Sequence, residues 1–287
     1  MEDRRIYKAN ALIEAGYRLS VAEHRILLAC ISQVRRDSPI TDEVLYTVRA
    51  KDIAERADIS RQAAYQDLKA AADRLFERHV TVPYAPDGKA PVIRKFRWVQ
   101  EAVYHESEGK VSIRLSKPVL PYLSQLTERF TVYQMDDVAR MTSAHGIRLY
   151  ELLVQWRGRG EREVEVGWLK RSFQLEGQYA SIKDFKRWVI EPAVEQINNV
   201  SPLWVEWDQR KTGRKVTHLR FTFGLKDELE TSKPSKGNEA KRVHSGTNEL
   251  VAGIPKHVIE QYANPGESYT MAAARLHADR REGKVAW

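Results

Sequence analysis

The sequence predicts an α+β fold: two tandem winged helix-turn-helix domains followed by a C-terminal flexible and helical extension. Two observations predict it. One order of elements occurs twice, namely helix, short strand, helix, turn, basic helix and then strands around a turn, which is the order of a winged helix-turn-helix. The two copies also keep a constant spacing, because helix starts at Ser20 and Ser60 recur near Ser143 and at Ser181, 121 to 123 residues later.

The first copy begins with Ser20 and Glu23, whose spacing is that of a capping box, and apolar residues follow at helical intervals. After a break at Asp58-Ile59, Ser60 is placed to cap a second, longer helix. The other elements expected here are a strand at 44–48, a short helix at 50–57, strands at 80–82, 92–103 and 110–115, and a turn at 86–88. The short helix and the helix after Ser60 form the predicted helix-turn-helix.

The second copy repeats this order between His145 and Phe223. Ser181 is placed to cap its basic helix. Pro192 falls inside that helix and cannot donate a hydrogen bond to the carbonyl of Trp188, so we expect a kink or a frayed turn there. The other elements expected are helix 145–156, strand 164–166, helix 168–173, a turn at 177, strands 203–207 and 217–223, and a turn at 209–215.

The composition of the chain favours some classes of protein and excludes others. The chain has 287 residues, a net charge of +8 and a pI of about 9.4, which favours a polyanionic partner. A single cysteine excludes an intramolecular disulfide and a cysteine-rich zinc site. No apolar run is long enough to span a bilayer and no secretory signal opens the chain, so we expect a cytoplasmic protein.

The domain boundaries expected from these patterns are 1–133 for the first winged helix, 134–226 for the second, 227–249 for a flexible linker and 250–287 for a short helical extension. The linker segment has no aromatic residue and mixes charges with Ser, Gly and Pro. Within the extension, short helices are expected from Ile254-Pro255 to about residue 263 and over 269–281.

Candidate DNA contacts gather in the second copy. A recognition helix enters the major groove by its N-terminal residues, where Arg and Lys can bind guanine edges or phosphates. Cations at a helix N-terminus oppose the helix dipole, so they are not there for helix stability. A solvated face on a core helix is the alternative, but the basic hairpin that follows favours DNA. The candidates are Ser181, Lys183, Lys186 and Arg187 on the helix, and Arg210, Lys211, Arg214 and Lys215 on the hairpin.

The first copy gives a weaker signal, and an ordinary polar helix face is the stronger alternative there. Arg61 and Gln62 lie in the first turn of its basic helix, where base edges would be reached. The tryptophans are expected in the core, except that Trp188 follows Arg187 and could lie in the core or face a groove. The candidates in the first copy are Ser60, Arg61, Gln62, Tyr65 and Lys69.

No catalytic signature occurs in the sequence. No run matches a Walker A loop, and no two histidines flank a single hydrophobic residue as a rolling-circle nickase requires. No acidic cluster resembles a two-metal nuclease site. We therefore expect no catalytic residues, no bound metal and no cofactor.

Four groups of residues occur in an order and at distances that are specific to one family. They are Glu128-Arg129-Phe130-Thr131, Ile147-Arg148-Leu149-Tyr150-Glu151-Leu152-Leu153, Asp184-Phe185-Lys186-Arg187 with Glu195-Gln196-Ile197-Asn198, and Thr217-His218-Leu219-Arg220-Phe221-Thr222-Phe223. On these residues the chain resembles the iteron-binding replication initiators of theta-replicating plasmids, the family of the F-plasmid initiator. The likeness extends from about Tyr7 to Leu225, so the C-terminal extension lies outside it.

The resemblance implies a specific function. Monomers are expected to bind direct repeats in duplex DNA at an origin, with the second domain reading most of each repeat. The first domain is expected to contact the other end of the repeat and to form a homodimer interface. Dimers would repress their own gene, while bound monomers would help to open an AT-rich stretch and recruit the host initiator and replicative helicase.

Two other functions remain open at this stage. The chain could be a winged-helix transcriptional repressor that acts only as a dimer and has no replication role. It could also be a nicking initiator whose catalytic site has no recognisable motif.

Overall fold

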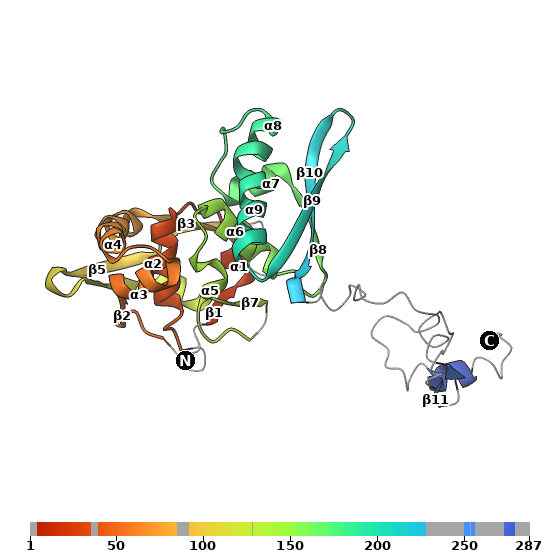
Figure 1. The fold of residues 1–287 in the computed structure, drawn as a ribbon, viewed down its shortest axis with the longest axis horizontal. Coiled ribbons are helices and arrows are strands. Elements are labelled where there is room, and N and C mark those ends of the chain that lie inside the picture. Colours follow the sequence, from red (N-terminus) through yellow and green to blue (C-terminus); the bar gives the residue numbers. More distant parts are fainter. Residues whose placement is uncertain are drawn as a thin grey trace, which may run out of the picture. The chain divides into compact units, whose positions relative to one another are not determined.

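The computed structural model describes residues 5–35, 40–84, 92–127, 129–227, 250–252, 254–255 and 273–278 (Figure 1). The chain divides into two units, Met1–Pro234 and Ser235–Trp287. Both winged helices belong to the first unit, so their packing against each other can be followed in detail.

The first winged helix has the predicted order of elements. They are α2 (Val21–Ile31), β2 (Leu45–Arg49), α3 (Ala50–Ala57), α4 (Arg61–Glu77), β3 (His79–Tyr84), β4 (Val92–Arg97), β5 (Val99–His105) and β6 (Lys110–Leu115). The capping box is confirmed, since the Glu23 amide donates to Ser20 Oγ at 3.3 Å and the Ser20 amide donates to the Glu23 carboxylate at 2.9 Å. α4 buries an apolar face from Ala64 to Leu75 and packs on α2 and α3.

The expected strand at 92–103 is wrong in one respect, because it is two strands that belong to different sheets. The break is at Trp98, whose side chain is fully buried. Its amide donates to the carbonyl of Arg78 at 3.3 Å and its carbonyl accepts from the amide of Ser116 at 3.0 Å. β4 pairs with β3, while β5 joins the three-stranded antiparallel sheet β2-β6-β5. The β5–β6 hairpin is therefore the wing of the first domain, and β3–β4 is an additional hairpin.

The second winged helix repeats this topology. Its elements are α6 (Ala144–Val154), β8 (Glu161–Glu165), α7 (Val166–Ser172), α8 (Ile182–Phe185), the π-helical turn η4 (Lys186–Ile190), α9 (Glu191–Val200), β9 (Leu203–Thr212) and β10 (Lys215–Leu225). Its sheet has the order β8-β10-β9, which matches β2-β6-β5 strand for strand. The repeat in the sequence is thus a repeat in topology.

The irregularity expected before Pro192 takes the form of the π-helical turn. Within it the amide of Glu191 donates to the carbonyl of Lys186, five residues earlier. Because Pro192 has no amide hydrogen, the carbonyl of Trp188 cannot receive the α-helical bond from it. The helix does not fray but forms a π-turn, which contains one residue more than an α-helical turn. Its apolar face stays buried on both sides of this turn.

The predicted hairpin turn at 209–215 is too long. The strands continue to Thr212 and resume at Lys215, so only Gly213 and Arg214 lie between them. Gly213 has a φ of +62°, which suits a tight turn. Thr212 pairs with Lys215 at the end of the strand ladder, and the hydroxyls of Thr212 and Thr217 bond at 3.0 Å across the hairpin.

A further antiparallel pair of strands, which the sequence patterns do not predict, joins the start of the chain to the end of the first domain. β1 (Arg5–Ala9) pairs with β7 (Phe130–Gln134) in a register that sets Lys8 opposite Thr131. The remaining connecting elements of this unit are α1 (Asn10–Ile13), the 3-10 turns η2 (Glu106–Glu108) and η3 (Lys117–Tyr122), and α5 (Asp136–Ala139).

The second unit differs from the expectation at one point. Ile254–Pro255 form the strand β12, paired with β11 (Leu250–Val251), where the sequence predicts a helix start. A β-branched residue followed by proline favours extended backbone, which explains the strand. Residues 273–278 are helical, within the helix expected over 269–281. The turn at 86–88, the rest of the expected helices and nearly all of the 227–249 linker lie outside the described residues.

Candidate nucleic-acid interface

The second recognition helix presents the predicted cations from a capped start. The hydroxyl oxygen of Ser181 accepts a hydrogen bond from the amide of Lys183 at 3.2 Å. Phe185, Val189 and Ile190 are fully buried and fix the helix to the domain. Ser181, Lys183 and Arg187 are exposed, as predicted.

Lys186 differs from its neighbours because it bonds to the wing. Its ammonium donates to Oε1 of Gln209 at 2.9 Å and lies 5.8 Å from the centre of the Trp207 ring. The side chain is half-buried, so its charge sits at the junction of helix and wing rather than on the outer face of the helix. From this position it can add positive potential for a phosphate, but it reaches less far than Arg187.

Trp188 resolves the alternative left open by the sequence, because it is not a core residue. Its side chain is 58% exposed, and the guanidinium carbon of Arg187 lies 4.9 Å from its ring centre. The outer face of the π-helical turn therefore carries an arginine stacked on an indole.

Of the four cations predicted on the second wing, three are exposed at its tip, and the fourth, further back, is ion-paired. Lys211, Arg214 and Lys215 are exposed around the two-residue turn. Arg210 instead forms a bidentate contact with the carboxylate of Glu163 on β8, with a shortest distance of 2.9 Å. The hydrogen bond from Arg210 is the main reason why the pKa of Glu163 lies below its ordinary value, and the side chain of Arg220 adds to this effect. The positive charge of this basic hairpin is thus partly neutralised by Glu163 of another strand.

The first recognition helix has the predicted cap and the predicted exposed face. The hydroxyl of Ser60 accepts from the amide of Ala63 at 3.2 Å. The other four candidates, Arg61, Gln62, Tyr65 and Lys69, are all exposed. A carbon of the Tyr65 ring lies 3.6 Å from the ideal position of a Cβ atom on Gly109, so the ring packs against the turn at the tip of the first wing.

The first wing has little positive charge. Residues 106–108 read Glu-Ser-Glu, and the ammonium of Lys110 bonds to the carboxylate of Glu108 at 2.5 Å. The strand topology of this wing equals that of the second, but its tip is acidic. Phosphate contacts of the kind expected at Lys211 to Lys215 have no counterpart here.

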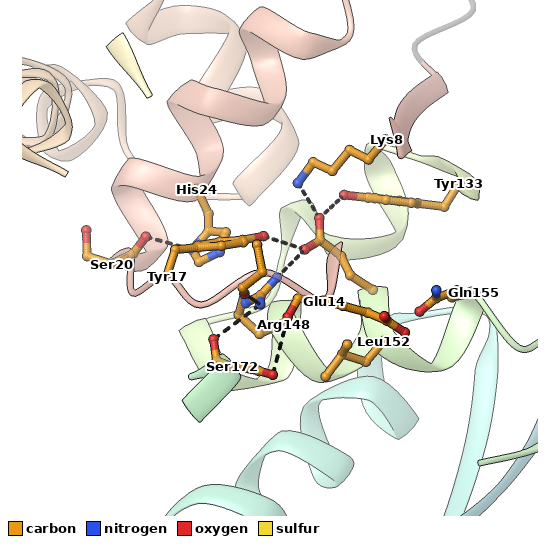
Figure 2. A network of polar contacts seen from close by, with 12 residues as sticks. Lys8, Glu14, Tyr17, Ser20, His24, Tyr133, Arg148, Leu152, Gln155 and Ser172 are labelled. Atoms are coloured by element: carbon orange, nitrogen blue, oxygen red, sulfur yellow. Dashed lines mark hydrogen bonds and ion pairs between the residues drawn. The ribbon is translucent and has the colours of Figure 1, made fainter. Parts of the chain in front are cut away.

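A buried polar cluster joins the two winged helices, as Figure 2 shows. Its centre is the carboxylate of Glu151 on α6, which is fully buried. It accepts hydrogen bonds from Lys8 Nζ at 2.5 Å, Tyr133 OH at 2.5 Å, Tyr17 OH at 3.0 Å and Arg148 Nη1 at 3.3 Å. Two of these donors come from β1 and β7 and one from the segment before α2, so a single carboxylate connects the second domain to three segments of the first.

Burial and the neighbouring charges shift the pKa values of the ionisable groups in and beside the cluster. Burial alone would raise the pKa of Glu151, but the charges of Lys8 and Arg148 outweigh burial and lower it to about 2. Burial lowers the pKa of Lys8, and the charge of Glu151 opposes that shift. His24 of α2 lies beside this cluster, and burial lowers its pKa to about 4, so it is neutral at pH 7.

Two arginines of the second domain contact residues 14–17 of the first domain. The guanidinium of Arg148 lies 3.6 Å from the Tyr17 ring centre and donates to the carbonyl of Ala15 at 2.8 Å. Arg162 of β8 pairs with the carboxylate of Glu14 at 2.9 Å. These contacts therefore fix the two winged helices relative to each other.

The junction was missed at the sequence level, although one signal was present. Arg148 and Glu151 interrupt an otherwise apolar helix, and every residue from Gly146 to Val154 is buried. Two charges inside a helix that is buried all round must find partners elsewhere in the chain. Their partners, Lys8 and Tyr17, are more than 130 residues away in the sequence, and no local pattern identifies them.

The described part of the chain contains no group of three or more His, Cys, Asp or Glu side chains that could hold a metal ion. It also contains no helix that is both long and apolar enough to cross a membrane.

Comparisons with known proteins agree on one family. Residues 5–154 match the profile described as "Initiator Replication protein, WH1", and residues 165–223 match "Initiator Rep protein, WH2". An Escherichia coli protein named "Replication initiation protein" is 25% identical over 249 residues, which cover 84% of this chain and 76% of that protein. An "Uncharacterized 27.6 kDa protein" of the same organism is 28% identical over 233 residues, 78% of this chain and 94% of that protein.

A solved structure has the same fold. The Pi initiator protein, crystallised in complex with iteron DNA, superposes with a TM-score of 0.67 at 19% sequence identity. The match covers 79% of this chain and 99% of that one.

Proposed function

This chain belongs to the family of initiator replication proteins that pair a WH1 with a WH2 domain, and on that premise we propose that it initiates plasmid replication by binding direct repeats in duplex DNA at an origin. The observation that carries the proposal is the exposed, capped basic helix beside a basic wing in the second domain. The Pi initiator, which has the same fold, was crystallised with iteron DNA.

The second domain, residues 134–226, is assigned most of the reading. Its base-reading candidates are Ser181, Lys183 and Arg187, because they lie exposed at the start of the helix that would enter the major groove. Lys186 and the wing residues Lys211, Arg214 and Lys215 are assigned to phosphates. Arg210 is assigned a lesser phosphate role, since Glu163 already binds its guanidinium.

The first domain, residues 1–133, is assigned the other end of the repeat through α4. Its candidates are Ser60, Arg61, Gln62, Tyr65 and Lys69. The exposed face of α4 supports this role, whereas the acidic wing limits it.

DNase I footprinting on DNA that flanks the gene tests the proposal. Protection of several direct repeats supports an initiator, whereas protection of one palindrome favours a dimeric repressor without a replication role. Transformation with a plasmid that carries the repeats and the gene then separates replication from repression. The initiator role fails if the plasmid does not replicate although the repeats are bound.

We also propose that the first domain forms a homodimer in equilibrium with the monomer. β4 is the outer strand of a two-stranded sheet, and its first residues, Val92 and Ile93, are 52% and 71% exposed. An exposed apolar edge strand is suited to pairing with a second copy. In sedimentation velocity, Ile93→Asp should shift the equilibrium to monomer, while Val44→Asp, on an apolar residue that is 40% exposed, should not. Equal dimerisation of wild type and Ile93→Asp would place the interface elsewhere.

The dimer is assigned to repression of its own gene, and the bound monomer to opening an AT-rich stretch and recruiting the host initiator and replicative helicase. We further propose that the protein has no catalytic activity. Incubation with supercoiled origin plasmid and Mg²⁺ or Mn²⁺ should leave the plasmid intact. Nicked circles that depend on the protein would overturn this part of the proposal.

A further inference from the structure

Two aromatic side chains stand out on the surface of the described residues. Six large apolar side chains there are more than a third exposed. Four are aliphatic and lie on or beside β2 and β4, namely Val44, Leu45, Val92 and Ile93. The two aromatic ones lie one on each recognition helix, Tyr65 at 39% and Trp188 at 58% exposure. Trp188 is not among the residues that the sequence assigns to DNA.

The backbone holds Trp188 outward. It lies in the middle of the π-helical turn Lys186–Ile190, directly before two fully buried residues, Val189 and Ile190. With those side chains packed in the core, the helix geometry directs the indole away from the domain. π-turns are rare and recur at functional sites, which agrees with a functional reason for this exposure.

Charges of both signs surround Trp188. Arg187 lies over its ring, and Asp184 and Glu191, about one turn before and after it, are exposed. The same carboxylates can accept from the amino group of cytosine, so this stretch of helix fits the floor of a major groove.

We propose that Trp188 is a specificity-determining residue that reads thymine through its C5-methyl group. Among the bases only thymine presents a methyl in the major groove, and an apolar side chain identifies it by removing both surfaces from water. Arg187 lies 4.9 Å over the same ring, so the indole also holds the guanidinium beside the thymine contact. This inference rests on the proposed DNA-binding function and adds to it the base that the second domain selects at this point.

The test replaces single methyl groups in the DNA. Synthetic duplexes of the footprinted repeat carry deoxyuridine in place of thymidine at one position at a time, and full-length protein is titrated onto each. For wild type, one or two positions should weaken binding about fourfold, the effect of losing one buried methyl-sized group of ~0.8 kcal/mol. Trp188→Ala should bind the thymine and uracil duplexes equally at those positions.

Control variants separate this role from weaker explanations. Trp188→Leu keeps an apolar side chain and should keep part of the methyl discrimination. Val44→Ala truncates another exposed apolar residue, outside the recognition helices and the proposed dimer edge, and should leave the discrimination intact. Because Trp188 is largely exposed, its replacement should leave the circular dichroism spectrum and thermal unfolding unchanged.

Each outcome bears on the proposal. If Trp188→Ala weakens binding but still distinguishes thymine from uracil as wild type does, the indole acts only by holding Arg187 and the methyl reading is overturned. If wild type protects a repeat but is indifferent to every uracil, Trp188 loses its role while the proposed function stands. If no repeat is protected, the proposed function falls and this inference falls with it.

Discussion

The two wings share one topology and differ in charge. β5–β6 and β9–β10 each continue a three-stranded sheet of the same strand order. The tip of the first reads Glu-Ser-Glu, while the tip of the second carries Lys211, Arg214 and Lys215. The fold has therefore been repeated without repeating the surface that would bind phosphate. Fold similarity alone does not predict which domain would bind phosphates, whereas the charge of the wing favours the second domain.

The recognition helices differ in a parallel way. α4 is one regular helix that follows a three-residue turn, residues 58–60, in which Asp58 adopts a left-handed conformation with φ of 55°. In the second domain nine residues, 173–181, precede a helix that is interrupted by the π-turn. The regular copy presents an ordinary polar face, and the irregular copy presents Arg187 and Trp188. The departure from ideal helix geometry thus marks the domain to which we assign most of the reading.

The largest expected effect is on stability, and it comes from disrupting the buried polar cluster around Glu151 that joins the two domains. Glu151→Ala leaves Lys8 and Arg148 buried without their carboxylate, which should cost about 3–5 kcal/mol of unfolding free energy. Chemical denaturation monitored by tryptophan fluorescence measures it. Glu163→Ala, which removes an exposed ion pair on the second wing, is the control and should change stability little. If the two variants lost the same unfolding free energy, the buried cluster would stabilise the protein no more than an exposed ion pair does.

The first helix of each winged-helix domain, α2 or α6, has a different residue at the fourth position after its capping serine. His24 lies four residues after the capping Ser20, and the residue four after Ser143 is Ile147. The pKa of His24 in the folded protein is about 4, below the ordinary 6.5, so the unfolded chain binds more protons between these values. Stability should therefore fall by about 2.5 kcal/mol as the pH drops from 7 to 4.5. His24→Ile, which copies the second domain, should flatten that fall. An unchanged pH profile would contradict the buried neutral histidine.

The next prediction compares the recognition helices directly. Arg187→Ala should weaken binding to the cognate repeat by about 1–3 kcal/mol if Arg187 reads a base, and should weaken binding to random DNA much less. Arg61→Ala, at the start of α4, should have a smaller effect on the cognate repeat. Electrophoretic mobility shifts on both DNAs measure the two variants. Equal losses on cognate and random DNA would leave Arg187 with a phosphate role only.

The smallest effect per residue concerns the wings. Replacing Lys211, Arg214 and Lys215 with Gln should flatten the dependence of log K on log salt by about 0.9 per lost phosphate contact. Glu108→Gln on the first wing should leave that slope unchanged, because we expect this wing not to contact DNA. A salt titration of both variants checks the pair. If only the Glu108→Gln variant changed the slope, the assignment of the wings would be reversed.

Local patterns in the sequence predict much of this fold. The capping box of Ser20 and Glu23, the caps at Ser60 and Ser181 and the alternation of strands after Leu203 are short-range signals, and the structure confirms each. The exposure of Arg61, Lys183 and Arg187 follows from the same helical periodicity. These features depend on residues three or four apart, which is the range over which propensity and capping act.

What the sequence did not predict depends on distant residues. The pairing of β1 with β7 joins segments separated by more than 120 residues. Glu163 neutralises Arg210 from a strand that lies 47 residues earlier, so the wing carries less free charge than its composition suggests. Trp188 was left open because its exposure depends on how a π-turn resolves a proline, and periodicity assumes a regular helix.

The hydrogen bond between Lys8 and Glu151 also limits the order in which parts of the chain can fold during synthesis. The two residues are 143 positions apart, so at 5–20 residues per second the lysine waits roughly 7 to 30 seconds on the ribosome for its carboxylate. During that interval β1 has no complete binding site, because β7 and α6 follow later in the chain. The helix-turn-helix of the first domain can form early from local contacts, whereas the hydrogen bond from Lys8 forms only when α6, at the start of the second domain, has been made. The beginning of the nascent chain thus reaches its native place later than the helix-turn-helix that follows it in the sequence.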